Sequence, residues 1–334
     1  MTTPGTLLLR SAIPFALCAL VLLSAATAAD GTEQAERLAQ IPSPRLYAAT
    51  SPLNTPIAGG AAIDPRSEAM VAQLVREVGE KGWAISSREY TMPLFRADAR
   101  TNLVSVRVRT RGTTHRVPIP TGAFPSPGSD GHLAVIDGRK GCEYDFYRAR
   151  RLSDGSWEAE NFNALPITGS GIYPRGLATR ASGFANAAGL ITAKEMARGR
   201  IDHALVFTMA ATRAGGPVPP ASSSDGTSSG EGTIPEGARL QLDPALSLES
   251  LQPWQRVIAR ALQRYGMYLA DTGGAVALFA QHPDSAPGAR YPWGNDVDYG
   301  YLPSWLVRHL RVLELPAPQR SVHRFVPNRC LTRP

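Results

Sequence analysis

The chain has 334 residues and a formal net charge of +7 at pH 7, from 35 Lys and Arg residues against 28 Asp and Glu. This length suffices for one large domain with a well-buried core, and the positive charge favours acidic polysaccharides, cell-wall polymers or membranes as partners. Nucleic acid is not expected as a partner, because no Lys/Arg run is longer than Arg150-Arg151 and aromatic residues do not interleave with basic ones.

Residues 1–29 have the pattern of a secretory signal peptide. Arg10 precedes an apolar run from Ile13 to Leu23, and Ala26-Thr27-Ala28 follows it. The run is too short for a bilayer core of roughly 30 Å, and the alanines have the form of a cleavage site. A retained membrane anchor is the alternative. We therefore expect a secreted protein, extracellular or periplasmic, that is free of the membrane once the signal is removed.

Two cysteines remain after signal removal, Cys142 and Cys330. In an oxidising compartment they are expected to form a disulfide. This bond would fasten the C-terminal tail, residues 319–334, and contribute on the order of 4–5 kcal/mol in the chain-entropy model. Two unpaired thiols are the alternative. No Cys or His spacing is typical of a zinc site, so no metal ligands are assigned.

The start of the mature chain predicts an arm and then a helix. Residues 30–60 are polar and then rich in Pro and Gly, which indicates an extended N-terminal arm. Asp64-Pro65 can open a helix, and apolar residues recur at helical spacing from Met70 to Val78 before Gly79 ends the pattern.

Short strands and turns dominate the rest. Val104, Val106 and Val108 alternate with polar residues, as in a half-exposed strand. Asp-Gly dipeptides between later apolar segments favour hairpin turns and predict an antiparallel meander. The expected strands of this meander are residues 132–137, 142–149 and 156–160.

In the second half, Thr192 to Glu195 has capping-box spacing and begins a short helix. The expected strands here are residues 201–208, 238–242, 267–271 and 275–280, of which the last two should form a hairpin. Residues 215–233 are rich in Gly, Pro and Ser and predict a flexible loop. The segment Pro253 to Tyr265 has the apolar spacing of an amphipathic helix.

These elements predict a mainly β fold, a β-sandwich or jelly roll of antiparallel strands decorated by a few helices. A single domain should cover residues 61–318, since no internal boundary or repeat is visible, and we expect a monomer.

The strongest candidate for chemistry is the expected strand from Cys142. Glu143, Asp145 and Tyr147 share one face of it, because alternate side chains point to the same side. Two carboxyl groups beside an aromatic ring suit the cleavage of a sugar chain. The spacing is similar to the E-x-D-x-x-E signature of β-sandwich endoglucanases, although the final acid is missing and Arg148 stands near its place. A solvated strand face is the alternative.

Two histidines and one aspartate complete the proposed catalytic set. His203 shares a strand face with apolar residues, and His132 on an earlier strand could join it in lining a groove. Asp271 ends a strand at a glycine turn, where a carboxylate either caps the turn or projects into a cleft. Core packing is the alternative for His203.

Further residues are candidates for binding substrate or a cation. Arg175, Arg180 and Arg239 could hold a carboxylate, and Tyr265 flanks Asp271. Asp225 in the Ser- and Gly-rich loop is a weak indication of calcium, and no other cofactor is expected.

Three segments resemble blocks found in a group of secreted, largely uncharacterised bacterial proteins: Gly131 to Asp137, Arg200 to Leu205 and Tyr265 to Asp271. The resemblance extends over roughly Pro52 to Leu315. It implies one continuous domain, loosely similar to lectin-like and glucanase-like β-sandwich proteins, and no established activity accompanies it.

We expect a secreted carbohydrate-active enzyme that cleaves an extracellular polysaccharide, with Glu143 and Asp271 as the carboxyl pair. One alternative is a polysaccharide lyase acting on a uronate polymer, with Tyr or His as base and Arg to neutralise the uronate. Another is a non-catalytic glycan-binding or cell-envelope protein. In each case the expected partner is a polysaccharide, with acidic polysaccharides among the candidates.

Overall fold

The computed structural model describes Met1 and residues 45–79, 82–318 and 329–330. All of these except Met1 belong to one unit, Ser43–Pro334. The predicted signal peptide from residue 2 onward, the arm up to residue 44 and most of the tail lie outside the described residues. In the described part, no helix is both long enough and apolar enough to cross a membrane.

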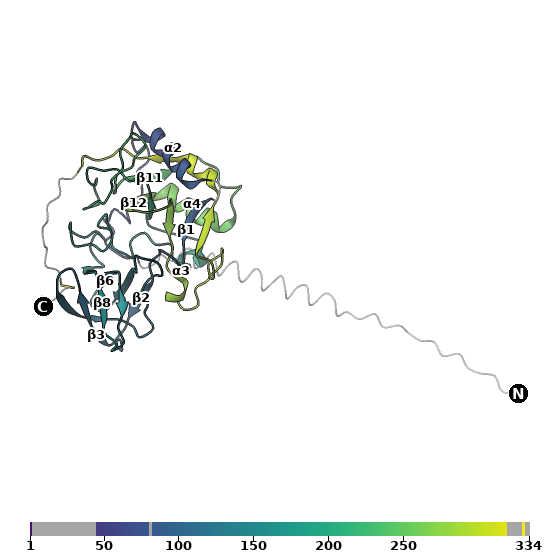
Figure 1. Cartoon of the computed structure of the whole chain (residues 1–334). Coiled ribbons are helices and arrows are strands. Elements are labelled where there is room, and N and C mark those ends of the chain that lie inside the picture. The colour runs from purple at the N-terminus through teal and green to yellow at the C-terminus, as the bar shows by residue number, and fades with distance from the viewer. Residues whose placement is uncertain (2–44, 80–81, 319–328, 331–334) are drawn as a thin grey trace. The chain divides into compact units, whose positions relative to one another are not determined.

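The largest sheet has seven strands and carries helices on one face. In spatial order its strands are β14 (Tyr299–Leu302), β1 (Trp83–Ser86), β13 (Ala277–Phe279), β10 (Leu205–Met209), β12 (Met267–Thr272), β11 (Arg239–Leu242) and β15 (Leu310–Val312). The helices α2 (Ser67–Val78), α4 (Pro253–Arg264) and η2 (Ser304–His309) share a hydrophobic core with this sheet. Figure 1 shows α2 and α4 beside β1, β11 and β12.

Two four-stranded sheets form the other part of the unit, where Figure 1 shows β2, β3, β6 and β8 together. The middle sheet has the order β2 (Leu94–Ala97), β5 (Leu133–Asp137), β6 (Cys142–Tyr147) and β9 (Asn161–Pro166). The outer sheet has the order β4 (Thr113–Pro118), β3 (Leu103–Val108), β8 (Trp157–Ala159) and β7 (Arg150–Arg151). A further helix, α3 (Ala193–Arg198), and the short η1 (Pro283–Ser285) lie outside the sheets.

The hydrophobic cores to which alternate side chains of a strand belong show how the sheets are layered. On β10, Leu205 and Phe207 belong to the core shared with the helices, whereas Val206 belongs to a second core that includes Ala134 of the middle sheet. On β5, Leu133 instead belongs to a third core shared with the outer sheet. Both faces of the middle sheet are therefore buried.

The fold is mainly β, as the sequence predicts, but the sheets are mixed rather than purely antiparallel. Strand β1 runs parallel to β13, and β10 runs parallel to β12. The capping box at Thr192 and the helix from Pro253 are confirmed. The predicted meander holds for β5 and β6 but not for β8, which leaves them for the outer sheet.

The predicted hairpin between the strands flanking Gly273 is wrong. Strand β10 lies between β12 and β13, so the glycine turn crosses the end of β10. The Gly273 N–H donates to the Met209 carbonyl at 3.0 Å, and a Cβ at Gly273 would meet the Thr208 side chain at 2.2 Å. A glycine is needed here because the backbone approaches β10 so closely.

The described part of the predicted arm, residues 45–60, does not extend over the surface. Tyr47 and Leu53 are buried in the core between the large and middle sheets. The Tyr47 N–H donates to the Ile167 carbonyl at 2.6 Å, and the Leu53 carbonyl accepts from Ala204 at 2.7 Å. These contacts make the segment an integral part of the packing.

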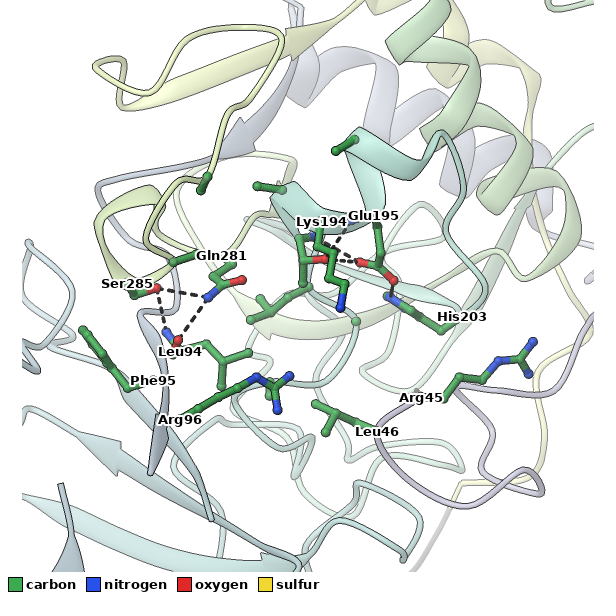
Figure 2. Close-up of a pocket in the computed structure, with 18 of the residues that line it drawn as sticks. Arg45, Leu46, Leu94, Phe95, Arg96, Lys194, Glu195, His203, Gln281 and Ser285 are labelled. Atoms are coloured by element: carbon green, nitrogen blue, oxygen red, sulfur yellow. Dashed lines mark hydrogen bonds and ion pairs between the residues drawn. The ribbon is translucent and has the colours of Figure 1, made fainter. Parts of the chain in front are cut away.

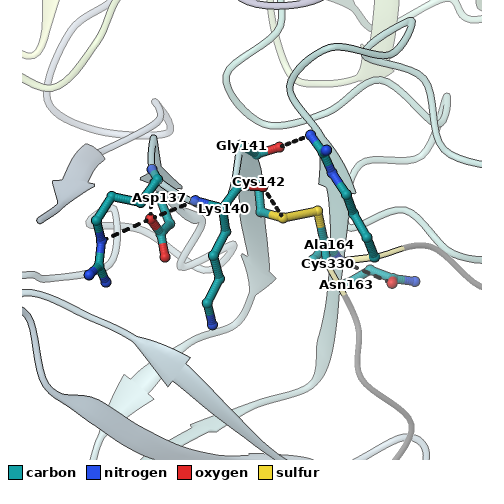
Figure 3. The surroundings of a disulfide bond; sticks show 9 residues. Asp137, Lys140, Gly141, Cys142, Asn163, Ala164 and Cys330 are labelled. Carbon is teal, nitrogen blue, oxygen red and sulfur yellow. Dashed lines mark hydrogen bonds and ion pairs between the residues drawn. A yellow bond between two sulfur atoms is a disulfide. The ribbon is translucent and has the colours of Figure 1, made fainter. Parts of the chain in front are cut away.

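The predicted disulfide between Cys142 and Cys330 is confirmed, with a Cα–Cα distance of 5.6 Å (Figure 3). It ties the C-terminal segment to the start of β6, and both cysteines belong to the core between the middle and outer sheets. The neighbouring Arg329 Nη2 donates to the Gly141 carbonyl at 3.5 Å.

Candidate functional site

The two acids of β6 are sealed inside the protein, contrary to the expectation of an open strand face. Glu143 and Asp145 are both 0% exposed. Their face of the middle sheet is turned toward the large sheet. The alternation of polar and apolar residues along β6 therefore does not mark a face that is open to solvent. Glu143 is therefore unable to meet a polysaccharide in this conformation.

Glu143 and Asp145 are held by buried hydrogen-bond donors, and together they form the β6 pair. Glu143 accepts from the Tyr47 hydroxyl at 2.7 Å and from the Ala187 N–H at 2.8 Å. Asp145 accepts from the Tyr173 hydroxyl at 3.0 Å and from the Asn186 N–H at 2.9 Å. Burial, with the adjacent Glu143 charge, raises the pKa of Asp145 well above its ordinary value. These contacts join β6 to the loop before α3.

Arg180 is a buried residue near both the β6 pair and Asp271. It is 3% exposed, and its three side-chain nitrogens have no hydrogen-bond partner among the described residues. Its guanidinium lies 5.0 Å from the centre of the Phe279 ring. Burial lowers the pKa of Arg180, whereas the nearby charges of Asp271 and Asp145 raise it. Arg180 is therefore a buried cation that compensates carboxylates on two sides.

His132 and Tyr147 lie at the edge of this region. The His132 ring is 5% exposed, its Nδ1 lies 3.3 Å from the Phe146 carbonyl, and its centre is 5.3 Å from that of Tyr147. Burial and then Arg180 lower the pKa of His132 to about 3, so the ring is neutral at physiological pH. Tyr147 is partly exposed; burial raises its pKa, and Asp271 is among the acidic groups that raise it further.

Asp271 belongs to a group of three carboxyl groups that we call the Asp271 cluster, with Asp225 and Glu236. One oxygen of each lies within 4.8 Å of the others. Asp225 is exposed, Asp271 is partly exposed and Glu236 is fully buried. The Thr272 hydroxyl donates to Asp225 at 2.5 Å, which fixes the loop of Asp225 to the end of β12.

Two members of the Asp271 cluster, Asp271 and Glu236, hold their protons more tightly than free carboxyl groups do. Burial raises the pKa of Asp271 to about 7 against the lowering by Arg180, and it raises the pKa of Glu236 to about 9. Ser224 and the Asp225 amide are near enough to lower the pKa of Glu236 slightly, yet neither carboxylate oxygen accepts a hydrogen bond of normal geometry. A carboxyl group with a pKa near 7 can act as a general acid.

The Asp271 cluster is also the group of described residues whose spacing could hold a metal ion. It includes Asp225, the residue for which the sequence indicates calcium. Oxygen ligands of this kind suit calcium, and the calcium expectation stays a prediction.

The other predicted binding residues have mainly structural contacts. The Arg239 guanidinium donates to the Tyr265 carbonyl at 2.7 Å and to the Thr55 carbonyl at 2.6 Å, and it lies over the Tyr268 ring. Tyr265 is 1% exposed. Arg175 is partly exposed and is not a member of the β6 pair or of the Asp271 cluster. Arg239 and Tyr265 therefore hold the protein together and do not face a ligand.

A separate pocket of about 800 Å³ lies at the start of β10, beside α3 and β2 (Figure 2). His203 lines it and is the single member of the predicted catalytic set that does so. Because β10 and β12 are parallel, this pocket and the Asp271 cluster lie toward opposite ends of the same strand pair.

Both nitrogens of His203 are occupied. Its Nε2 lies 3.0 Å from Glu195 and its Nδ1 lies 3.0 Å from the Ala204 carbonyl. Glu195 raises the pKa of His203 against the effect of burial, and its other oxygen accepts from the Thr192 N–H and hydroxyl. This ion pair joins α3 to β10 and leaves the imidazole without a free nitrogen for catalysis.

The chain matches no protein-family model, no curated protein and no solved structure. The candidate function is therefore argued from the arrangement of the residues alone.

The structure brings together a part of the predicted set and adds residues that the sequence analysis missed. Asp271 and His132 both lie near Arg180, whereas Glu143 is enclosed and His203 is in the separate pocket. Glu236 was missed altogether; it lies in Ile234-Pro235-Glu236-Gly237, just before β11, and its spacing from Asp271 carries no pattern.

Proposed function

We propose that this protein is a secreted carbohydrate-active enzyme that cleaves a polysaccharide at the Asp271 cluster, with Asp271 as the general acid. One observation carries the proposal: the carboxyl groups of Asp225 and Glu236 meet that of Asp271, from a separate strand, where two of the three reach solvent. The disulfide supports export, because such bonds persist in oxidising compartments.

Asp225 and Asp271 can share the work of glycoside cleavage. Asp271 gives its proton to the glycosidic oxygen as the bond to the anomeric carbon breaks. In the same step Asp225 either forms a bond to that carbon, which water then hydrolyses with Asp271 acting as base, or takes a proton from the attacking water. Their oxygens lie within 4.8 Å of each other, which leaves less room for a water between them than the wider spacing of inverting enzymes does.

Arg180 and Glu236 act as positioning residues in this scheme. Arg180 balances the negative charge that Asp271 acquires after it gives up its proton. Glu236, which is fully buried, keeps its own proton at neutral pH and so adds no second charge beside the acid.

A lyase acting on a uronate polymer is the second candidate. The neutral His132 ring and the partly exposed Tyr147 lie side by side near Arg180. A lyase removes a proton from the carbon beside the uronate carboxylate, and this needs a base such as a phenol or an imidazole together with an arginine that pairs with the carboxylate. This route would use Tyr147 rather than Asp271 at the substrate.

The test incubates the purified protein with acidic and neutral polysaccharides and measures new reducing ends and ultraviolet absorbance. We expect reducing ends without absorbance, and a loss of about 10²–10⁴-fold in rate for Asp271→Asn. The matched control is Asp296→Asn, since Asp296 is exposed and outside the cluster. Ultraviolet absorbance would favour the lyase, and binding without any product would favour the glycan-binding alternative. Full activity of Asp271→Asn would overturn the assignment of the acid.

A further inference from the structure

The pocket in Figure 2 is lined by several positively charged side chains. Arg45, Arg96, Lys194 and Arg290 all line it, and all four are exposed. Among the described residues, none of Arg96, Lys194 and Arg290 has a carboxylate within ion-pair distance. Figure 2 shows Arg96 and Lys194 extending into the pocket.

The two acids of the pocket are already paired. Glu195 contacts His203 at 3.0 Å, and Asp202 contacts Arg200 at 2.6 Å. Neither is available to balance the four cations. Since a concave site concentrates the field of its charged groups, the pocket attracts anions.

The walls between the cations are of mixed polarity. Leu53, Leu94 and Leu190 supply apolar surface, while Asn54 and Gln281 supply side-chain amides. Gln281 Nε2 donates to the Leu94 carbonyl at 3.0 Å, which fixes its orientation and leaves its oxygen available to a ligand. The cations come from four separate segments of the chain. Figure 2 shows Arg45 apart from Arg96 and Lys194, whereas a compact anion such as phosphate needs donors that converge on one point.

We propose that this pocket binds a carboxylated saccharide chain, with Arg96, Lys194 and Arg290 pairing with successive carboxylates and the leucines packing against sugar rings. A sugar ring offers both C–H faces and hydroxyl groups, which matches the mixed walls, and a uronate adds the spaced negative charges. The inference rests on the proposed function in that it takes the ligand to be part of the polymer that the Asp271 cluster cleaves. The pocket would then hold the substrate away from the bond being broken.

The position of the pocket makes this a separate site. His203 precedes the first residue of β10, whereas Asp271 lies near the last residue of the parallel β12.

The test measures binding of a fluorescent oligogalacturonate to the full chain by anisotropy, at low and at high salt. We expect saturable binding that weakens with salt, and a loss of about tenfold or more in affinity for the double variant Arg96→Gln, Arg290→Gln. The matched control is Arg308→Gln, an exposed arginine outside the pocket, which should bind as the wild type does. All three residues are exposed, so the variants are expected to fold.

Competition separates the possible ligands. A neutral cello-oligosaccharide should not displace the probe, and neither poly-glutamate nor inorganic phosphate should displace it as well as unlabelled oligogalacturonate does. Equal displacement by poly-glutamate or phosphate would overturn the assignment to a saccharide, and unchanged affinity of the double variant would overturn the site.

The Asp271→Asn variant separates this inference from the proposed function. It should bind the probe normally while losing cleavage. A wild-type protein that binds the probe but cleaves no polysaccharide would leave the pocket standing while the proposed enzyme fails, and a wild-type protein that cleaves without binding the probe would have the opposite meaning.

Discussion

The β6 pair and the Asp271 cluster both contain carboxyl groups whose pKa values burial raises, namely Glu143 and Asp145 in the pair and Glu236 and Asp271 in the cluster, yet they differ in what surrounds them. Glu143 and Asp145 accept hydrogen bonds from two tyrosines and two backbone amides and have no exposed surface. In the Asp271 cluster, Asp271 is partly exposed and Asp225 is exposed. A raised pKa alone therefore does not identify a catalytic group; access to solvent is also needed.

The largest contrast is expected in stability. Glu143→Ala would leave the Tyr47 hydroxyl and the Ala187 N–H without an acceptor in a buried site, at a cost of about 3–5 kcal/mol together with the cavity. Asp271→Ala should not destabilise the protein at neutral pH, since Asp271 is partly exposed and its pKa of about 7 already lowers the stability of the folded state there. Urea unfolding followed by circular dichroism measures both. Equal destabilisation by the two substitutions would mean that the Asp271 cluster is structural.

The pH dependence of the rate should also distinguish the Asp271 cluster from the β6 pair. If Asp271 must be protonated, kcat should fall about tenfold per pH unit above its pKa of about 7. Rates measured from pH 5 to 9 on a cleaved polysaccharide give the profile. Tyr173→Phe, which touches only the β6 pair, should leave the profile in place, and a profile that rises through pH 7 would contradict the role of Asp271 as acid.

The free energy of unfolding should also depend on pH through the Asp271 cluster. The folded pKa values of Asp271 and Glu236, about 7 and about 9, lie above those of an unfolded chain. Their contribution is therefore fully present below about pH 4 and is lost as the pH rises through 7 and 9, with a slope of up to about 1.4 kcal/mol per unit for each group. Glu236→Gln should flatten this decline relative to the wild type in urea unfolding at several pH values. A decline that is unchanged in the variant would show that it comes from other groups, such as the β6 pair.

Unfolding measured in the presence of calcium tests whether the Asp271 cluster binds a cation. A cation bound by the Asp271 cluster would displace its protons and raise the stability of the wild type at pH 8, but not that of Glu236→Gln. Thermal unfolding with and without calcium measures this difference, and an equal shift in both proteins would place any bound calcium elsewhere.

The smallest expected effect is that of Tyr173→Phe on stability. It removes one hydroxyl that donates to Asp145 and should cost about 1–3 kcal/mol, without any effect on oligogalacturonate binding. A loss of binding would show that the β6 pair and the pocket are linked through the loop before α3.

The sequence predicted individual helices and strands better than it predicted which strands pair with one another. The helix from Pro253, the capping box at Thr192 and the disulfide follow from spacing and composition. The crossing of β10 between β12 and β13 does not, because hydrophobic periodicity specifies a strand without specifying its partner. The same limit explains why Glu143 was expected on an accessible face. Alternation on β6 indicates two different faces, but it does not show that both faces of the middle sheet are buried.

The candidate site was predictable only in part, for a related reason. Asp271 stands out because it ends an apolar strand at a double glycine. Glu236 and Arg180 do not, since each lies in an irregular segment and becomes significant only through neighbours distant in the chain. The cations of the pocket are likewise scattered over four segments, so their grouping is a property of the tertiary structure.

The placement of β1 has a consequence for how the protein folds. Strand β1, at residues 83–86, pairs on one side with β13 at residues 277–279 and on the other with β14 at residues 299–302. Contacts between residues so far apart form slowly, because a long loop must close before they contribute any stability. The hairpin of β5 and β6 should therefore form early and β1 should dock late, which leaves its exposed edges open to aggregation during refolding.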